Sequence, residues 1–530
     1  MRAIHWGGAH RLTQCEPGGR EDIMKRTTIV RALLAGSALV LSTGALAQEA
    51  EPQPDTSDAT ADAAIAGAQD LDDAQAKIEL LQAQVEALQE SIAQIQANQA
   101  KATPSWKGAP ELGDKDAGFT FKPKGFMQFD AGYVGFPDGE ERNGTVGGLN
   151  YNNLGWSTRA RRLVFGVEGS LPGGFKYKAE FNFAQGKVDY EDILLSYDFK
   201  DSPLTVSVGN FYPYSSLETV TSSRLGSMLE RASFTDAFAY ERRLGVGLSL
   251  ADKTADKYTL SAGVFSGKIN DDVFNRTSWE AGIRGTFTPK LSNGFIHLGA
   301  SAHYRKNNRD AQGAQYRSRP LTQVTDQRFI DTGTIASDGD FSAGIELGGV
   351  MKSFHFAAEV QKLWVRGFDP SKVLTEPNDI ITGNRYNEDP SFEGGYAELG
   401  YYLTGESRGY KGGKWDRTKV LKPFDQGGWG AIQLNARLDY LNLTDKVGGT
   451  AVTAGYPSGS SSAFVNGGKQ LGYQFSVIWN PMDYLRFMAQ YGHVDITGGP
   501  RAATADPDGP LNARRKYGVD TAAVRAQLEF

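Results

Sequence analysis

Phe175-Lys-Tyr-Lys-Ala-Glu-Phe-Asn-Phe183 is the stretch that decides the fold class. Its odd-numbered residues are aromatic or Ala, and its even-numbered residues are Lys, Lys, Glu and Asn. Successive side chains of a β-strand point to opposite faces, so a period of two gives one strand an apolar face and a polar face. The stretch therefore predicts a strand with apolar surroundings on one side and water on the other.

The same alternation recurs from residue 119 onward. It is clear in 278–288, 429–441, 470–480 and 484–495, where aromatic residues gather at the ends of the apolar face. Such runs are close to the ~9–11 residues that cross a bilayer at a tilt, and longer than the ~5–6 of globular sheets. A soluble β-sandwich also alternates, but run length, aromatic ends and the lack of helical patterns favour a membrane barrel.

Counting these runs predicts an all-β fold, a 16-stranded antiparallel transmembrane β-barrel over residues 119–530. The candidate strands are 124–134, 158–168, 174–184, 190–200, 203–211, 243–251, 257–266, 278–288, 294–305, 341–351, 353–365, 394–404, 429–441, 470–480, 484–495 and 515–530. Short connections mostly alternate with long ones, as they do in barrels with short periplasmic turns and long outer loops. Residues 405–428 break this rule, because they are long where a short turn is due.

Composition and the C-terminus agree with this prediction. The chain has 63 Gly among 530 residues, 28 Phe and 22 Tyr, with a mean hydropathy of −0.41. It lacks an apolar run near the ~20 residues that a membrane helix needs, which excludes a multi-helix membrane protein. The chain ends Val524-Arg-Ala-Gln-Leu-Glu-Phe530, an alternating run closed by an aromatic residue. Such an ending is similar to the signal for outer-membrane insertion.

The N-terminal region reads as an export signal. Residues 24–47 combine Lys25 and Arg26, a short apolar stretch and Ala45-Leu-Ala47, which predicts a cleaved signal peptide. Residues 1–23 are expected to be an upstream mis-start, and they hold the single Cys. Residues 48–70 are predicted to be an acidic flexible spacer.

Residues 71–100 are predicted to form a coiled coil in the periplasm, followed by a linker over 101–118. Apolar residues recur at spacings of three and four: Leu71, Ala74, Ile78, Leu81, Val85, Leu88, Ile92 and Ile95. β-branched residues at the first heptad position with Leu at the fourth favour two strands, so a trimer would need contacts between the attached domains. A single amphipathic helix packed on another domain is the alternative.

Charge argues against nucleic-acid binding. Residues 119–530 hold 46 basic and 45 acidic residues, so the acidic balance of the chain belongs to its N-terminal region. A nucleic-acid partner would need a clear basic excess on one face.

Several motifs resemble the phosphate-selective porin O/P family. The most specific are Leu204-Thr-Val-Ser-Val-Gly-Asn-Phe-Tyr-Pro-Tyr-Ser-Ser-Leu-Glu218, Thr221-Ser-Ser-Arg224, Met228-Leu-Glu-Arg231 and Arg242-Arg-Leu-Gly-Val246. Arg161-Arg162, Leu403-Thr-Gly-Glu-Ser407 and Tyr410-Lys-Gly-Gly413 add to the likeness. The resemblance implies a trimeric outer-membrane porin whose third outer loop, here 212–242, folds into the lumen as a constriction. It also implies that 405–428 is an extended periplasmic turn.

The resemblance assigns an anion pathway to six arginines: Arg161, Arg162, Arg224, Arg231, Arg242 and Arg243. One departure matters: family members often have Gln-x-Lys where this chain has Asn210-Phe-Tyr212, so a lysine expected near the constriction is missing. The departure bears on phosphate selectivity more than on the porin class.

Strand parity adds further lumen cations: Lys124, Lys176, Lys178, Arg284, Arg305, Arg437, Arg486 and Arg525. The alternative is that lumen carboxylates such as Glu168, Asp192 and Glu346 pair with these cations and brace the wall. By parity with Leu163, Arg161 and Arg159 are expected to point outward at the rim. Arg224 and Arg231 lie seven residues apart, so they share a face if that segment is helical.

The predicted function is a water-filled outer-membrane porin of a Gram-negative bacterium for passive uptake of anions such as phosphate. A less selective diffusion porin and a structural or adhesive barrel are the alternatives. We expect no enzyme activity, cofactor or metal site, because no HExxH, Gly-x-Ser-x-Gly or phosphate-cradling loop occurs. Expected partners are small anions, outer-membrane lipid and two further copies of the chain.

Overall fold

The structure is a computed structural model. It describes residues 75–93, 105–106, 109–114, 117–137, 145–146, 149–150, 154–267, 269, 278–307, 313–367, 383–384, 386–447, 463–502 and 514–530. The chain divides into two compact units, Met1–Glu90 and Ser91–Phe530. The predicted regions 1–23, 24–47 and 48–70 lie outside the described residues, as do 71–74, 94–100 and, within the predicted linker, 101–104, 107–108 and 115–116.

A helix over residues 75–93 covers much of the predicted coiled coil. Every residue of this helix is solvent-exposed, including the apolar side chains at Ile78, Leu81, Val85, Leu88 and Ile92. An exposed apolar seam of this kind is typical of a helix that pairs with other helices. The helix therefore agrees with the predicted coiled coil, and its pairing with other helices remains a prediction. None of the helices in the described part of the chain is both long and apolar enough to span a membrane.

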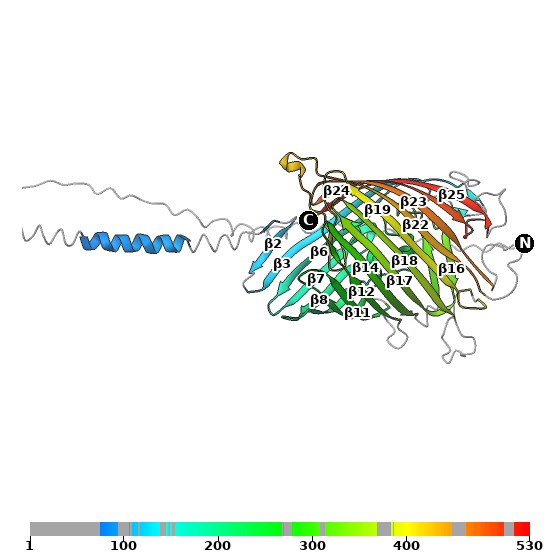
Figure 1. Ribbon diagram of the computed structural model, residues 1–530, viewed down its shortest axis with the longest axis horizontal. Coiled ribbons are helices and arrows are strands. Elements are labelled where there is room, and N and C mark those ends of the chain that lie inside the picture. The colour runs from blue at the N-terminus through cyan, green and yellow to red at the C-terminus, as the bar shows by residue number, and fades with distance from the viewer. Residues whose placement is uncertain are drawn as a thin grey trace, which may run out of the picture. The chain divides into compact units, whose positions relative to one another are not determined.

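The remainder is a closed barrel of sixteen antiparallel strands, as predicted. In chain order the barrel strands are β3 (Phe119–Val134), β6 (Gly155–Leu171), β7 (Phe175–Asn182), β8 (Asp189–Asp198), β9 (Leu204–Phe211), β10 (Arg243–Ala251), β11 (Tyr258–Ser266), β12 (Trp279–Phe287), β14 (Gly294–Lys306), β17 (Ser337–Met351), β18 (Phe354–Gly367), β19 (Ser391–Tyr402), β22 (Ala431–Lys446), β23 (Phe464–Met482), β24 (Leu485–Thr497) and β25 (Lys516–Glu529). Each strand pairs with the next, and β25 pairs with β3 to close the cylinder. Figure 1 shows the strands side by side at a common tilt.

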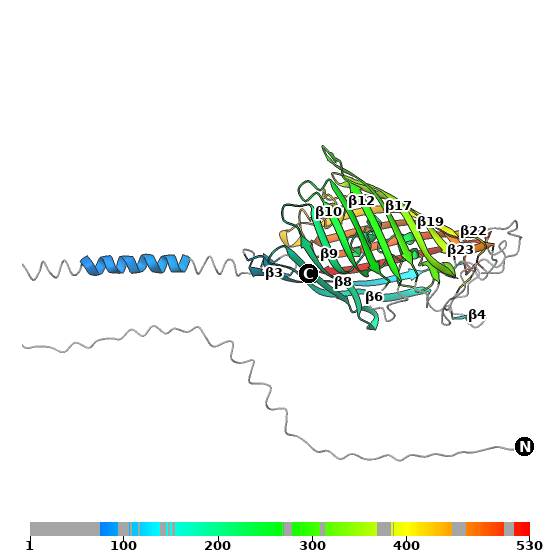
Figure 2. The same ribbon diagram turned by 90° about the horizontal axis from the view of Figure 1, so that it is seen from below.

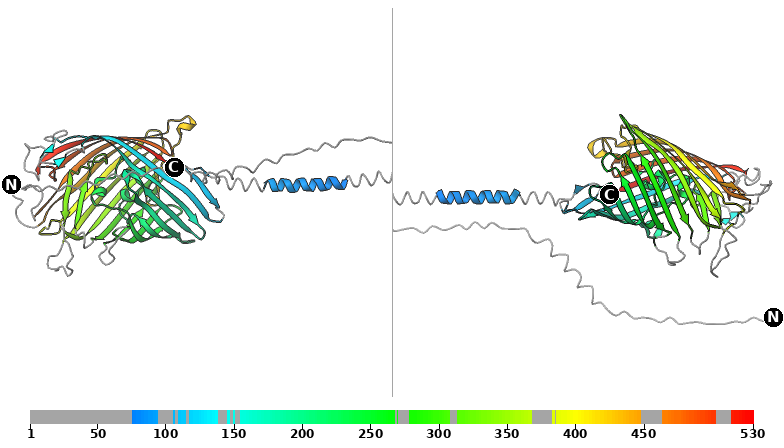
Figure 3. Two further views of the ribbon diagram at one scale, coloured as in Figure 1. Left: turned by 180° about the vertical axis from the view of Figure 1, so that it is seen from behind. Right: turned by 60° about the horizontal axis from the view of Figure 1, so that its bottom comes forward.

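Exposed and buried residues alternate along the barrel strands, so each strand has an outer and an inner face, as predicted. In β25 every second residue is exposed, from Gly518 through Val524 to Leu528, while the residues between them are buried. Because water fills a barrel of this width and lipid covers its exterior, the exposed apolar residues are those that face lipid. The red C-terminal strand lies beside the cyan β3 when the barrel is seen from behind (Figure 3).

Closure of the barrel between β25 and β3 brings the backbones of Phe530 and Gly125 close together. Phe530 and Gly125 exchange a pair of backbone hydrogen bonds of 3.0 Å, and the Phe530 ring lies 5.6 Å from the ring of Phe165. A Cβ at position 125 would come within 2.6 Å of the Phe530 ring. Glycine at 125 therefore allows the last residue of the chain to join the first barrel strand.

Short elements precede the first barrel strand and lie in the connections between barrel strands; Figure 2 labels one of them, β4. The short strands are β1 (Ser105–Trp106), β2 (Pro110–Asp114), β4 (Thr145–Val146), β5 (Leu149–Asn150), β13 (Lys290–Leu291), β15 (Ala314–Ser318), β16 (Ile330–Ile335), β20 (Gly409–Lys411) and β21 (Lys414–Asp416). The short helices are η1 (Ala184–Gly186), α2 (Leu217–Val220), η2 (Ser223–Leu225), α3 (Ser233–Ala237) and η4 (Phe424–Gln426). The long segment between β19 and β22 contains β20, β21 and η4, so the anomaly at 405–428 is an extended turn.

Candidate functional site

The connection between β9 and β10, residues 212–242, contacts inward-facing side chains of β18, β22, β24 and β25. This segment is the one predicted as the constriction, and it is called the constriction loop below. It contains α2, η2 and α3, and Leu217, Phe234 and Phe238 of this loop are fully buried. Burying an aromatic or Leu side chain stabilises a fold by roughly 1.5–3 kcal/mol. These residues therefore fix the loop against the wall with its polar side chains left to line the passage.

Wall side chains hold the constriction loop through its backbone. The amides of Leu217 and Glu218 donate to the two carboxylate oxygens of Glu359 at 2.9 and 2.7 Å. On β24 and β25, the Gln490 side chain accepts from the Leu229 amide, and Arg525 donates to the Leu229 carbonyl at 2.6 Å. Because two parts of the loop are tied to different strands, the loop is a fixed part of the lumen.

A second segment, between β14 and β17, folds against the constriction loop. The Arg319 amide donates to the Asp236 carboxylate of α3 at 3.0 Å, and Asp326 accepts from Arg159 of β6 at 3.0 Å. Leu321 and Phe329 belong to the same buried apolar cluster as Phe234 and Phe238. The sequence predicts an ordinary outer loop here, and its entry into the lumen was missed.

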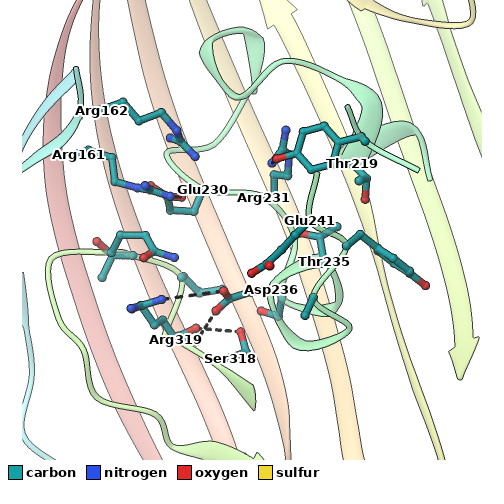
Figure 4. Close-up of a pocket in the computed structure, with 17 residues that line it drawn as sticks. Arg161, Arg162, Thr219, Glu230, Arg231, Thr235, Asp236, Glu241, Ser318 and Arg319 are labelled. Atoms are coloured by element: carbon teal, nitrogen blue, oxygen red, sulfur yellow. Dashed lines mark hydrogen bonds and ion pairs between the residues drawn. The ribbon is translucent and has the colours of Figure 1, made fainter. Parts of the chain in front are cut away.

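Between these two segments and the wall lies a cavity of about 250 Å³. Figure 4 shows Arg161 and Arg162 reaching into it from one side, with Arg231, Glu241 and Asp236 on the other and Arg319 below. The hydroxyl groups of Tyr212, Thr219, Thr235, Ser318 and Thr322 also line it. The cavity lies in the part of the lumen that the constriction loop narrows.

A β-bulge explains why two consecutive arginines enter this cavity. The pairing of β6 with β3 shifts between Gln128, which faces Arg162, and Phe129, which faces Ala160. Arg161 is the extra residue, and an extra residue re-aims a side chain that simple alternation would direct outward. The predicted outward position of Arg161 at the rim is therefore wrong. Arg159 is also directed inward, because its guanidinium binds Asp326 of the in-folded segment.

The four arginines of the cavity differ in their ionic partners. Arg161 makes a bidentate pair with Glu230, with nitrogen–oxygen distances of 2.8 and 2.9 Å, and Arg319 lies 3.1 Å from Asp326. Arg162 donates to the neutral Gln128 amide oxygen at 3.0 Å. Arg161 and Arg525 hold the pKa of the buried Glu230 carboxyl well below its usual range, although burial opposes this shift.

Arg231 is bound entirely by neutral acceptors. It donates to the carbonyls of Glu218 and Thr221 at 2.9 and 2.8 Å and to the Tyr212 hydroxyl at 3.1 Å. Within the described residues, neither Arg231 nor Arg162 has a carboxylate within ion-pair distance. These two guanidinium groups are therefore fixed in position and uncompensated by any direct ion pair, although Glu230 and Glu191 act on Arg162 at longer range.

Tyr212 stands where the family resemblance implies a lysine. Its ring centroid lies 4.3 Å from the Arg242 guanidinium and 5.1 Å from that of Arg231. Burial opposes ionisation of the phenol, but the two guanidinium groups more than offset it, and the pKa of Tyr212 lies below its ordinary value. The Tyr212 ring thus packs against the guanidinium groups of both Arg231 and Arg242.

Most of the other predicted lumen cations form ion pairs with carboxylates. This agrees with the alternative in which such pairs brace the wall of the lumen. The pairs are Lys124 with Glu168 and Glu180, Lys176 with Asp198, Lys178 with Glu180 and Asp192, Arg242 with Glu191 and Asp192, Arg243 with Glu280, Arg284 with Glu346, Arg305 with Asp340, Arg437 with Glu218 and Glu398, and Arg525 with Asp130 and Glu230. These cations stabilise the wall of the lumen.

Arg224 and Arg231 do not share a helical face. Arg224 lies in η2 and pairs with Glu529 at 3.2 Å, whereas Arg231 follows η2 outside any helix and binds Tyr212. The segment between them is too irregular for the seven-residue spacing to apply. Arg486 donates to the carbonyls of Arg224 and Gly226, and it lines a small space near the 405–428 turn together with Arg408 and Arg417.

The β20–β21 hairpin of the extended turn also enters the lumen. The Gly413 carbonyl accepts from Arg284 at 2.8 Å, and the Tyr410 hydroxyl lies 2.7 Å from His297 Nδ1 of β14. Arg408 pairs with Glu398 at 2.8 Å. The hairpin therefore narrows the lumen at the end of the barrel that carries the extended turn, which its sequence did not predict.

The described part of the chain holds no group of three or more His, Cys, Asp or Glu placed to bind a metal ion. His297 and His303 of β14 face inward as alternation predicts, and both are buried. His297 Nε2 lies 3.0 Å from Glu346, within the network that braces the wall.

A closed barrel with an arginine-lined constriction is the architecture of an outer-membrane porin. The family model described as "Phosphate-selective porin O and P" matches residues 144–530, and the chain belongs to this family. A protein of Caulobacter vibrioides with no described function is 36% identical over 439 residues, covering 80% of this chain and 77% of that protein. Porin O of Pseudomonas aeruginosa is 27% identical over 360 residues, covering 64% of this chain and 76% of that protein.

Solved structures with a similar fold include an anion-selective porin from Comamonas acidovorans. It has a TM-score of 0.41 and 10% identity, covering 78% of this chain and all of that chain. The outer membrane channel DcaP of Acinetobacter baumannii has a TM-score of 0.42 and 13% identity, covering 78% of this chain and 98% of that chain.

Proposed function

We propose that this porin is a passive channel for small oxyanions, with phosphate among them. The observation that carries the proposal is the pair Arg162 and Arg231, two fixed guanidinium groups without carboxylate partners in the constriction cavity. Guanidinium groups bind the oxygens of phosphate and carboxylate in a planar, bidentate geometry. The description of the family, phosphate-selective porin O and P, supports the same class of solute.

The balance of charges in the cavity favours weak binding over trapping. Arg161 and Arg319 lie beside the carboxylates of Glu230 and Asp236, so these pairs add little net attraction for a passing anion. Conduction requires sites that are attractive enough to enter and weak enough to leave. Arg162 and Arg231, which lack direct carboxylate partners, attract the anion, and the neighbouring ion pairs add no further attraction that would hold it.

The test is the reversal potential of the reconstituted protein in a potassium chloride gradient across a planar bilayer. The wild type is expected to prefer anions, and Arg162→Gln with Arg231→Gln is expected to lose most of that preference. Lys200→Gln, in the periplasmic turn between β8 and β9, removes one cation outside the lumen and serves as the control. A cation-selective wild type would overturn the proposal.

A less selective diffusion porin is the second candidate, favoured by Tyr212 in place of a lysine and by the exposed carboxylate of Glu241 in the same cavity. Titrating phosphate against chloride separates the two. Block of the chloride current by phosphate supports an oxyanion site, and absence of block supports the diffusion porin. A barrel with no conductance at all would instead be structural or adhesive.

We further propose that three copies of the chain assemble in the outer membrane after export with a cleaved signal peptide, and that residues 71–100 join them as a periplasmic coiled coil. The exposed apolar seam of the 75–93 helix supports the coiled coil. Mass measurement of the detergent-solubilised full chain, compared with a chain lacking 71–100, tests the assembly.

A further inference from the structure

β12, β14, β17 and β18 are neighbouring strands of the barrel (Figure 1). They carry a row of outward-facing aromatic side chains: Trp279, Tyr304, Phe341 and Trp364. Tyr304, Phe341 and Trp364 are direct cross-strand neighbours. The rings of Trp279 and Tyr304 lie 5.0 Å apart, and those of Phe341 and Trp364 are stacked at 5.8 Å. The row lies near the strand ends that lead into long connections, so it marks the outer boundary of the membrane.

Lys362 interrupts the lipid-facing surface just inside this row. In β18 the outward positions run Val360, Lys362 and Trp364, and all three side chains are exposed. The Lys362 ammonium lies 5.7 Å from the centre of the Trp364 ring. Lipid-facing lysines are unfavourable by roughly 2–4 kcal/mol at the bilayer midplane and by ~0–1 kcal/mol near its surface. A lysine at this depth is therefore placed to reach the headgroup layer along its flexible stem.

Two more cations lie on the outer side of the row. The Arg366 guanidinium donates to the Tyr304 hydroxyl at 2.6 Å and lies 5.5 Å from the centre of that ring. Arg366 and Lys306 share one carboxylate, that of Asp338, at distances of 3.7 and 3.6 Å. These separations are longer than hydrogen bonds, so Asp338 compensates the two cations only weakly.

Lys306, Lys362 and Arg366 together form the outer basic patch. Apart from Asp338, the nearest cross-strand acid is Glu393, opposite Lys362, and Glu393 is hydrogen-bonded to Tyr440. The patch therefore has three cations and two nearby carboxylates. Asp338 contacts two of the cations only weakly, and Glu393 is already hydrogen-bonded to Tyr440. Aromatic rings bind the region between headgroup and acyl chain, and adjacent cations bind the phosphates there.

We propose that the outer basic patch binds the phosphate groups of an anionic lipid in the outer leaflet of the outer membrane. Lys362 holds a phosphate from below the aromatic row, and Arg366 and Lys306 hold a phosphate from above it. The acyl chains lie along Val360 and the neighbouring apolar residues. This site is on the outside of the barrel and does not depend on what passes through the lumen.

The test uses the full chain in detergent with lipid A, which carries two phosphates, and native mass spectrometry as the readout. The double variant Lys362→Gln with Arg366→Gln is expected to retain lipid A at least fivefold less than wild type. The control pair Lys352→Gln with Lys200→Gln removes two cations at the opposite, periplasmic end and is expected to bind as wild type does. Circular dichroism checks that each variant keeps its β content.

Three further arms decide the source of the ligand. The single variant Lys362→Arg is expected to retain lipid A as the wild type does, since it keeps the charge. Inorganic phosphate at millimolar concentration is expected to leave lipid A bound, and its displacement of the lipid would overturn a lipid site. Equal retention by the double variant, or cross-linking of a cysteine introduced at 362 to a second copy of the chain, would also overturn the proposal.

Discussion

The constriction cavity and the lumen wall contain the same residue types but use them differently. On the wall, Arg284 and Arg437 each lie 2.6 Å from a carboxylate. In the cavity, Arg162 and Arg231 are held by neutral oxygens. The number of cations facing the lumen therefore says little about selectivity, because a cation already matched by a carboxylate contributes almost no net field to a passing ion.

The largest expected effect comes from breaking a wall pair. Arg284→Met leaves the buried Glu346 without its main partner, and such changes destabilise proteins by about 3–5 kcal/mol. We expect a large fall in the urea midpoint of unfolding, measured for the barrel in lipid vesicles. Removing both charges with Arg284→Met and Glu346→Leu should recover most of the loss; a double variant no better than the single one would contradict this assignment.

The next effect concerns selectivity. Arg162→Gln removes an uncompensated charge, and a unit charge at ~4 Å in water is worth ~1 kcal/mol, so the anion preference should fall roughly fivefold. Lys178→Gln removes a lumen cation that is paired with Glu180 and Asp192. This matched variant should change the reversal potential less than Arg162→Gln does, and equal changes would erase the distinction between cavity and wall.

A smaller effect is expected from pH. The pKa of Tyr212 is lowered by Arg231 and Arg242 despite burial. As the pH rises through this pKa, a phenolate forms beside both guanidinium groups and cancels part of their charge. Anion selectivity should therefore decline on the alkaline side, and Tyr212→Phe should flatten that part of the profile. Reversal potentials between pH 7 and 10 give the measurement, and the same decline in the variant would assign it to another group.

The smallest effect is expected at an exposed wall pair. The Lys176 side chain is 61% exposed beside Asp198, and exposed pairs contribute only ~0–1 kcal/mol. Lys176→Gln should leave both the unfolding midpoint and the reversal potential close to wild type. A loss comparable to that of Arg284→Met would show that pairing distance, and not burial, sets the strength of the wall pairs.

The barrel could be predicted from the sequence because alternation is a local property. Each of the sixteen candidate strands overlaps one barrel strand, and even the anomaly at 405–428 corresponds to an extended turn. The residues of the cavity were only partly predictable. The family resemblance pointed to Arg161, Arg162 and Arg231, and these three line one cavity.

What the sequence did not reveal depends on contacts between distant residues. The bulge at Arg161 appears only in the pairing with β3, because alternation within β6 alone directs Arg161 outward. Arg319 joins the cavity through its contact with Asp236, 83 residues earlier in the chain. Two adjacent arginines at the start of an alternating run were the one local signal of the bulge, since strict alternation would place one of them against lipid.

The bond between Gly125 and Phe530 makes the last residue of the chain a neighbour of the first barrel strand. Until β25 pairs with β3, both strands expose unpaired backbone groups that lipid cannot satisfy. The two strands lie far apart in the sequence, and pairing over such a separation is slow. The meeting of β25 with β3 is therefore the step that removes the last open edges of the sheet, and no hairpin between neighbouring strands can substitute for it.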